Sequence, residues 1–135
     1  MSSTLSSAAD QAFMLLALTE AQKAAALDEI PVGAILVHQG EIIASAHNRR
    51  ELDQNPISHA EILALQEGAK KLGRWRLSDC TLYVTLEPCP MCAGAIVMAR
   101  LGRLVYGVAD YKTGSVESLF TIPTHPSLNH QVQVT

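Results

Sequence analysis

Hydrophobic and polar residues form blocks of different period along the chain, and each block predicts one element of secondary structure. Residues 7–27 (SAADQAFMLLALTEAQKAAAL) are rich in strong helix formers and contain no Gly or Pro, so they predict a helix. A proline and a glycine then interrupt the pattern. The apolar run 34–37 (AILV), a turn at 39–40 and the run 41–48 (EIIASAHN) predict a β-hairpin.

The segment after the hairpin predicts a loop and then an amphipathic helix. The polar stretch 53–56 (DQNP) is typical of a loop, and Ser58 is a residue type that begins helices. Up to Gly73, which is typical of a helix end, apolar side chains recur on one stripe: Ile62, Leu65, Ala69 and Leu72. We therefore expect a second helix that packs one face against a core.

The second half of the chain predicts two buried strands joined by a short helix. Run 80–86 (CTLYVTL) predicts a strand, run 91–100 (MCAGAIVMAR) predicts a helix closed by Gly102, and run 103–108 (RLVYGV) predicts another strand. This order predicts a parallel crossover, which is expected to be right-handed. The alternating end of the chain (HQVQVT) predicts an edge strand. The whole predicts a mixed sheet flanked by helices, an α/β sandwich.

Composition narrows the class of protein. The chain has 135 residues, of which 48% are hydrophobic and 17% charged, so we expect residues 1–135 to form one globular domain. The formal net charge of −3 gives no general attraction to nucleic acid or to anionic membranes. No apolar run is long enough to span a membrane, and the start (MSSTLSSAAD) lacks the features of a signal peptide. We therefore expect a cytoplasmic protein, in which three cysteines indicate free thiols or ligands.

Two of these cysteines carry the first chemical signal. Cys89 and Cys92 are three positions apart where a strand is predicted to meet a helix. At this spacing both sulfur atoms can reach one tetrahedral zinc ion, and the start of a helix favours thiolates. The same argument supports a redox dithiol of the thioredoxin type, and two small residues in a core would give the same letters. This stretch alone leaves all three interpretations open.

A second signal lies upstream, in the stretch 58–65 (SHAEILAL). It places His59 and Glu61 in the first turn of the second predicted helix. Each has an ordinary alternative: Ser58-x-x-Glu61 fits a capping box, and His59 can be a first-turn residue with no special role. Positions two apart on a helix differ by about 200°, so both side chains reach one cavity only from the end of the helix.

Taken together, His59-Ala60-Glu61 and Pro88-Cys89-Pro90-Met91-Cys92 resemble the H-x-E…P-C-x-x-C signature of the zinc-dependent nucleobase deaminases. A thioredoxin-like protein has no need of the first half. The resemblance implies that one Zn²⁺ per subunit is bound by His59, Cys89 and Cys92, with a fourth position open for water.

The resemblance gives Glu61 the catalytic role. Two thiolates cancel the charge of Zn²⁺, so we expect the metal alone to acidify its water less than a three-histidine site would. Glu61 then takes the water proton, delivers it to the ring nitrogen beside the reacting carbon, and passes a further proton to the departing amino group as ammonia leaves. Cys80 is left over and is interpreted as core packing, with a fourth zinc ligand as the alternative.

Within this superfamily, the chain is similar to the bacterial tRNA-specific adenosine deaminases from about Phe13 to the C-terminus. The similarity is carried by EIPVGAILV (29–37), AHNRRE (46–51), HAEILAL (59–65), TLYVTLEPCPMCAGAI (81–96), ARLGRLVYGVADYKTG (99–114) and HPSLNHQVQV (125–134). It implies a cytidine deaminase-like fold, a three-layer α-β-α sandwich with a mixed sheet of about five strands. It also implies hydrolytic deamination of adenosine to inosine at the wobble position of a tRNA anticodon.

Substrate contacts follow from the same resemblance. Asn48 would hydrogen-bond the purine, the backbone at Ala60 would contact the base edge, Ile30 and Val32 would form an apolar wall, and Asp110 and Lys112 would meet flanking nucleotides. An ordinary turn at Asn48 and a solvated charged turn at Asp110 and Lys112 are the alternatives. The family is dimeric, which implies a two-fold contact between identical surfaces, through the helix that holds the cysteines.

One departure concerns RNA binding. Family members usually continue into another helix with basic and aromatic residues that grip the anticodon loop, whereas this sequence ends at Thr135. We expect phosphate attraction from basic residues of the domain, of which Arg49 and Arg50 are the best placed.

Two alternative functions remain: a deaminase of a free base or nucleoside (guanine, or cytosine or cytidine), or a zinc or dithiol module without catalysis. The last predicts either a closed zinc site with Cys80 or His47 as the fourth ligand, or a disulfide between Cys89 and Cys92 and no metal.

Overall fold

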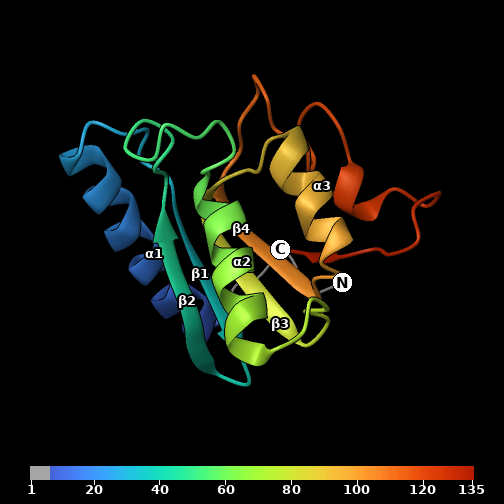
Figure 1. Cartoon of the computed structure of the whole chain (residues 1–135). Coiled ribbons are helices and arrows are strands. Elements are labelled where there is room, and N and C mark those ends of the chain that lie inside the picture. Colours follow the sequence, from blue (N-terminus) through green and yellow to red (C-terminus); the bar gives the residue numbers. More distant parts are fainter. Residues whose placement is uncertain (1–6) are drawn as a thin grey trace.

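Three helices and five strands alternate along the described chain, residues 7–135 of the computed structural model (Figure 1). Residues 1–6, on which part of the signal-peptide prediction rests, lie outside the described residues. The elements are α1 (Ala8–Ala26), β1 (Gly33–His38), β2 (Glu41–His47), α2 (Ala60–Leu72), β3 (Cys80–Leu86), α3 (Pro90–Met98), β4 (Arg103–Val108), the short 3₁₀ helix η2 (Ile122–Thr124) and β5 (Gln133–Val134). None of the described helices is long and apolar enough to cross a membrane.

The strands form one mixed sheet in the order β2-β1-β3-β4-β5. Strand β1 is antiparallel to both β2 and β3, whereas β3, β4 and β5 are parallel. The crossover predicted from β3 through α3 to β4 is therefore confirmed, and so is the edge strand at the end of the chain. Because β2, β3 and β4 run in the same direction, the loops that follow them leave the sheet at the same end.

Helices cover both faces of this sheet. Figure 1 shows α1 on one face and α2 with α3 on the other. Strand β1 alternates accordingly: Leu36 belongs to the larger core cluster with residues of α2 and α3, while Ile35 and Val37 pack with Ala17 of α1. Burial on both faces explains why the strands read as continuous apolar runs. The predicted three-layer α-β-α sandwich is confirmed.

The start of α2 corrects one prediction. Ser58 does not cap the helix, because its hydroxyl donates to Asp53 Oδ2 at 3.1 Å. His59 is the N-cap residue instead, with extended backbone angles, and no side chain makes a capping hydrogen bond. The Ser58-x-x-Glu61 capping box is therefore wrong. The predicted end at Gly73 is confirmed, with a left-handed φ of 70°.

The end of α3 corrects a second prediction, the role of Gly102. The helix ends at Met98, and Arg100 adopts the left-handed conformation that was expected of a glycine, with φ 58°. Gly102 lies beyond this turn and serves close packing, since a Cβ there would come within 2.3 Å of the Ser78 carbonyl oxygen. The prediction that Gly102 closes α3 is therefore wrong, although a glycine is required at this position.

Candidate active site

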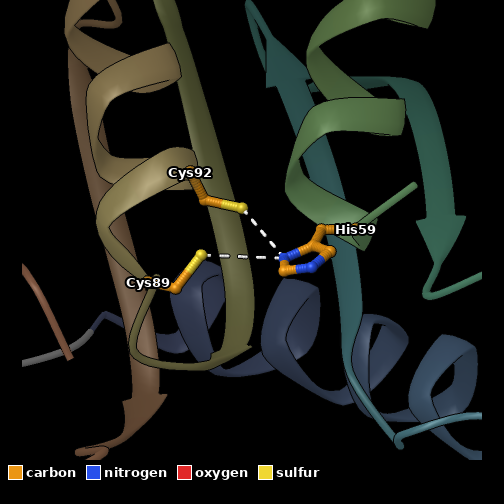
Figure 2. Close-up of side chains that lie close together, drawn as sticks. All are labelled: His59, Cys89 and Cys92. Carbon is orange, nitrogen blue, oxygen red and sulfur yellow. Dashed lines mark hydrogen bonds between the residues drawn. The ribbon is translucent and has the colours of Figure 1, made fainter. Parts of the chain in front are cut away.

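The N-termini of α2 and α3 bring three potential metal ligands together. His59 is the N-cap residue of α2, Cys89 is the N-cap residue of α3, and Cys92 lies in the first turn of α3. His59 Nδ1 lies 3.7 Å from Cys89 Sγ and 3.5 Å from Cys92 Sγ (Figure 2). The three donor atoms lie within 4.8 Å of one another, so two segments separated by some thirty positions meet at one point.

These distances fit a tetrahedral metal ion. An ion about 2.0–2.1 Å from an imidazole nitrogen and about 2.3 Å from a thiolate sulfur sets the nitrogen and sulfur about 3.6 Å apart. The observed values of 3.5 and 3.7 Å lie on either side of this separation. Three protein donors leave a tetrahedral ion one position open, as catalytic zinc sites do. One imidazole and two thiolates form a donor set that suits Zn²⁺.

Within residues 7–135, no other group of His, Cys, Asp and Glu side chains is placed to hold a metal ion. Cys80 is buried in the core cluster, where burial raises the pKa of its thiol to about 11. His47 turns its Nδ1 atom toward the Asn48 carbonyl oxygen, 3.2 Å away. Neither residue closes the site as a fourth ligand, which removes the basis for the closed structural site considered from the sequence.

The two thiols of the site are electrostatically coupled. A hydrogen bond with Cys92 lowers the pKa of Cys89 to about 5, against the effect of burial, and the N–H groups of the helix start and His59 contribute to the decrease. The same contact, together with burial, raises the pKa of Cys92 far above its usual range. The pair alone therefore favours one negative charge, and a divalent cation between the sulfur atoms stabilises the second thiolate.

Glu61 lies beside this group, as the second residue of α2. Its side chain is 4% exposed. Burial raises the pKa of Glu61 to about 7; its own N–H group opposes the increase, the charge of Cys89 adds to it, and a hydrogen bond with the Cys92 thiol opposes it. A carboxyl group with a pKa near neutrality can both accept and donate a proton at physiological pH. His59 and Glu61 reach the same space because both lie at the helix end.

A cavity of about 300 Å³ opens in front of the metal group. Its lining residues are Ile30, Val32, Asn48, Arg50, His59, Ala60, Glu61, Leu86, Glu87, Cys89, Asp110 and Thr113. The lining contains every site residue predicted from the sequence except two. Cys92 is fully buried but lies within 3.5 Å of His59, and Lys112 is exposed outside the lining.

Asn48 has a fixed orientation at this cavity. Its side chain is buried, and its Oδ1 atom accepts a hydrogen bond from the Arg50 N–H group at 3.3 Å. A backbone N–H group can only donate, so the carbonyl side of the amide must face it. Within the described chain, the Asn48 NH₂ group has no protein acceptor and remains available as a donor.

Sequence reasoning missed a buried carboxylate, Glu87, that organises one wall. Its side chain is 2% exposed and lies directly after β3. It accepts hydrogen bonds of 2.8–3.0 Å from the N–H groups of Asp110, Val116, Glu117 and Ser118, and another from the Ser118 hydroxyl. Burial alone would raise the pKa of Glu87, but these donors outweigh it and lower the pKa to about 2. The signal in the sequence was a charged residue between a buried strand and Cys89.

Glu29 has the equivalent role on the other side of the cavity. Its buried carboxylate accepts hydrogen bonds from the N–H groups of Glu51, at 3.2 Å, and Leu52, at 2.7 Å. These contacts fix the loop after β2, which carries Asn48 and Arg50. Two buried carboxylates therefore hold the two loops that flank the cavity, and both belong to stretches that the sequence singled out for other residues.

Comparison with known proteins agrees with this geometry. The MafB19-like deaminase family matches residues 8–133. The tRNA-specific adenosine deaminase of Bacillus subtilis (strain 168) is 50% identical over 125 residues, which cover 93% of this chain and 78% of that protein. The protein of the same name from Haemophilus influenzae (strain KW20 / Rd) is 50% identical over 127 residues, covering 93% of this chain and 73% of that protein.

Two solved structures extend the comparison. One comes from studies of A-to-I editing by tRNA:A34 deaminases at the wobble position of transfer RNA; it superposes with a TM-score of 0.89 at 45% identity, over 93% of this chain and 91% of that chain. The other is a guanine deaminase from Bacillus subtilis, with a TM-score of 0.71 at 31% identity, over 82% of this chain and 81% of that chain.

Proposed function

The chain belongs to the tRNA-specific adenosine deaminase family, and on this premise we propose that it converts adenosine to inosine at the wobble position of a tRNA anticodon. The reaction is a hydrolysis: water replaces the amino group at C6 of adenine, and ammonia leaves. One observation carries the proposal, namely the buried Glu61 carboxyl beside the group formed by His59, Cys89 and Cys92, at the wall of a cavity of about 300 Å³.

His59, Cys89 and Cys92 are the residues that would hold one Zn²⁺ ion. Zinc bound at such a site acts as a Lewis acid that makes water a nucleophile at neutral pH. The chain's own contribution is to keep both sulfur atoms at the start of α3, where unpaired N–H groups and the helix dipole stabilise thiolates. Glu61 lines the same cavity as His59 and Cys89, so its carboxyl group lies beside the ligand group.

Glu61 moves the protons of the reaction. It accepts one proton from the attacking water and donates it to the ring nitrogen beside C6. It then takes the remaining proton of the hydroxyl group now on C6 and passes it to the amino group as ammonia leaves. Burial raises the pKa of Glu61 to about 7, so that both protonation states are accessible near neutral pH. A solvated glutamate would be ionised too fully to donate efficiently.

The base binds between polar and apolar walls. The free NH₂ group of Asn48 donates to an acceptor of the purine ring, because its oxygen is already occupied by the Arg50 N–H group. Ala60 is the first residue of α2, and its N–H group is one of those that a helix leaves unpaired, so it can bind the opposite base edge. Ile30 and Val32 supply the apolar wall.

The turn that follows β4 contacts the nucleotides that flank the target. Asp110 lines the cavity, and its carboxylate accepts hydrogen bonds from the Lys112 N–H, at 3.0 Å, and from the Thr113 hydroxyl, at 2.9 Å. These contacts hold the backbone of the turn, in which Lys112 is exposed. Tyr111, which the sequence reasoning missed, is 80% exposed between them and offers an aromatic face on which a neighbouring base can stack.

We further propose that two copies of the chain form a homodimer through α2 and α3. Between these helices lies an apolar hollow lined by residues that include Ile62, Leu65, Trp75, Leu77 and Met98. Met98 is 70% exposed and Trp75 is 57% exposed, which is costly for a surface that stays in water. A two-fold contact would cover both residues at once. Light scattering of the wild type and of Met98→Glu tests this: the variant is expected to be monomeric.

We also propose that the enzyme acts in the cytoplasm, on its tRNA substrate. A second candidate, deamination of a free base, is favoured by the likeness to the guanine deaminase. Ammonia release from zinc-loaded protein separates the two: we expect release with unmodified tRNA and none with guanine, cytosine or cytidine. Release from guanine without inosine in tRNA would overturn the proposal and leave the zinc-dependent chemistry in place.

A further inference from the structure

Arg49 and Arg50 follow Asn48 directly, yet their side chains have different surroundings. Arg49 Nε donates to Asp53 Oδ1 at 3.1 Å, and Arg49 lies beside a separate hollow with Lys23 and Lys70. Arg50 lines the cavity, and across residues 7–135 its guanidinium group makes no ion pair and no hydrogen bond. It is the one Lys or Arg among the residues that line the cavity.

The backbone of Arg50 is fixed although its side chain is not. Its N–H group donates to Asn48 Oδ1 at 3.3 Å, and its carbonyl oxygen accepts from the Asn55 N–H group at 3.1 Å. The next two N–H groups are held by the buried carboxylate of Glu29. The guanidinium group is therefore carried on a rigid support at the cavity, next to the amide that binds the base under the proposed function.

The size and charge of the cavity determine where a phosphate group can lie. About 300 Å³ is at the lower end for small-molecule sites and accommodates a base or a nucleoside. The buried Glu87 carboxylate lines its interior and repels a phosphate there. The phosphate of a bound nucleotide must stay at the mouth, where Arg50 is exposed. The planar fork of N–H donors of a guanidinium matches a phosphate.

We propose that Arg50 binds a phosphate of the RNA backbone next to the target adenosine and thereby selects a polynucleotide over a free base or nucleoside. This inference rests on the proposed function and deepens it. A nucleoside carries no phosphate, so Arg50 adds nothing to its binding, whereas an RNA strand gains one charge-assisted contact. The paired neighbour Arg49 takes no part in this contact.

The test uses a zinc-loaded protein and an anticodon stem-loop RNA with the target adenosine. The same RNA is prepared with a neutral methylphosphonate at either phosphate that flanks the target. With wild-type protein, one replacement is expected to lower kcat/KM about tenfold. Arg50→Met is expected to show the same loss with unmodified RNA and no further loss with the modified RNA. For Arg50→Met, the slope of log kcat/KM against log salt concentration should be smaller by about one, as expected for the loss of one phosphate contact.

Two matched variants complete the design. Arg49→Met should keep the full sensitivity to the methylphosphonate, and Arg50→Lys should restore part of the rate, because it returns the charge without the planar fork. Thermal unfolding of each variant checks that the loop is intact. If Arg50→Met retains wild-type kcat/KM and wild-type sensitivity to the neutral phosphate, while inosine still forms, the assignment of Arg50 is overturned and the proposed function stands.

Adenosine 5′-monophosphate tests whether Arg50 binds the phosphate of a mononucleotide and not that of an RNA strand. If adenosine 5′-monophosphate is deaminated as well as the stem-loop, and Arg50→Met abolishes that activity, Arg50 serves a mononucleotide and the polynucleotide assignment is wrong. If the wild type forms no inosine in any RNA, the proposed function itself fails, and the inference fails with it.

Discussion

His59 Nδ1 lies 3.5 Å from Cys92 Sγ, although 33 positions separate the two residues. The contact arises because β2 and β3 run in the same direction, so that the helices following them, α2 and α3, both begin at one end of the sheet. Figure 2 shows the imidazole directed across the gap toward the two sulfur atoms. Two helix N-termini thus converge on one site, and both favour negative charge there.

Zinc content tests this arrangement. The purified protein is expected to bind one zinc ion per chain, and Cys92→Ser should lose it, because a serine hydroxyl is a poor substitute for a thiolate. Metal analysis by mass spectrometry gives the ratio. Cys80→Ala serves as the control, since Cys80 lies in the core and should leave the ratio at one. Stoichiometric zinc in Cys92→Ser would contradict the site.

Stability at low pH tests the role of Glu87. Its pKa is about 2 in the folded protein, below its ordinary value of 4.5, so the unfolded chain takes up the proton first as the pH falls. The stabilisation from Glu87 is therefore complete above about pH 4.5 and is lost toward pH 2, an effect of about 3 kcal/mol.

Urea unfolding of Glu87→Gln at several pH values measures this effect. The variant should have a lower free energy of unfolding than the wild type at pH 7, and the difference should shrink as the pH falls toward 2. Asp10→Asn serves as the comparison. A hydrogen bond from Arg103 lowers the pKa of Asp10 to about 2 as well, but Asp10 is not part of the cavity lining. A difference for Glu87→Gln that does not change with pH would rule out the proposed role.

The elements were largely predictable because each has a local pattern. The helix formers of α1, the apolar run of β3 and the stripe of α2 identified their elements, and the spacing of His59, Glu61, Cys89 and Cys92 grouped them before any geometry was known. The roles of Glu29 and Glu87 could not be predicted in this way. Their partners are backbone N–H groups of distant loops, and these have no sequence pattern.

The predictions were wrong where a local sequence rule was overridden by a contact that the rule does not consider. Ser58 had the correct type for a helix cap, but Asp53 binds its hydroxyl. The same Asp53 pairs with Arg49 and so separates two arginines that look equivalent in the sequence. Gly102 was assigned to a helix end, whereas its real constraint is the carbonyl oxygen of Ser78.

Asn48→Asp tests base recognition. The aspartate keeps an oxygen for the Arg50 N–H group but loses the NH₂ donor, so the loop should stay intact while the purine loses one hydrogen bond. We expect kcat/KM on tRNA to fall about 10- to 100-fold, since an unpaired buried acceptor costs about 1–3 kcal/mol. A lower kcat/KM in steady-state kinetics, with an unchanged melting temperature, would support the assignment. An unchanged kcat/KM would refute it.

Gly114→Ala tests the wall built on Glu87. A Cβ at this position would come within 2.3 Å of the Asp110 carbonyl oxygen and 2.5 Å of the Glu87 carboxylate, so the turn must move. We expect the free energy of unfolding to fall by about 1–3 kcal/mol, together with a higher KM for tRNA.

Gly94→Ala is the matched control for that variant. Its Cβ would meet nothing within 4 Å, and alanine favours the helix, so the stability should stay the same or rise. Equal melting temperatures for Gly114→Ala and the wild type would show that the turn does not depend on this close contact.

Inosine mapping at the wobble position of unmodified tRNA, with zinc measured in the same protein samples, tests the central claim most directly. The wild type should convert the wobble adenosine, and Glu61→Gln should bind zinc normally but react at least about 100-fold more slowly, because it can neither accept nor donate the proton. Equal rates for the two proteins, or no inosine with zinc-loaded wild type, would contradict the account.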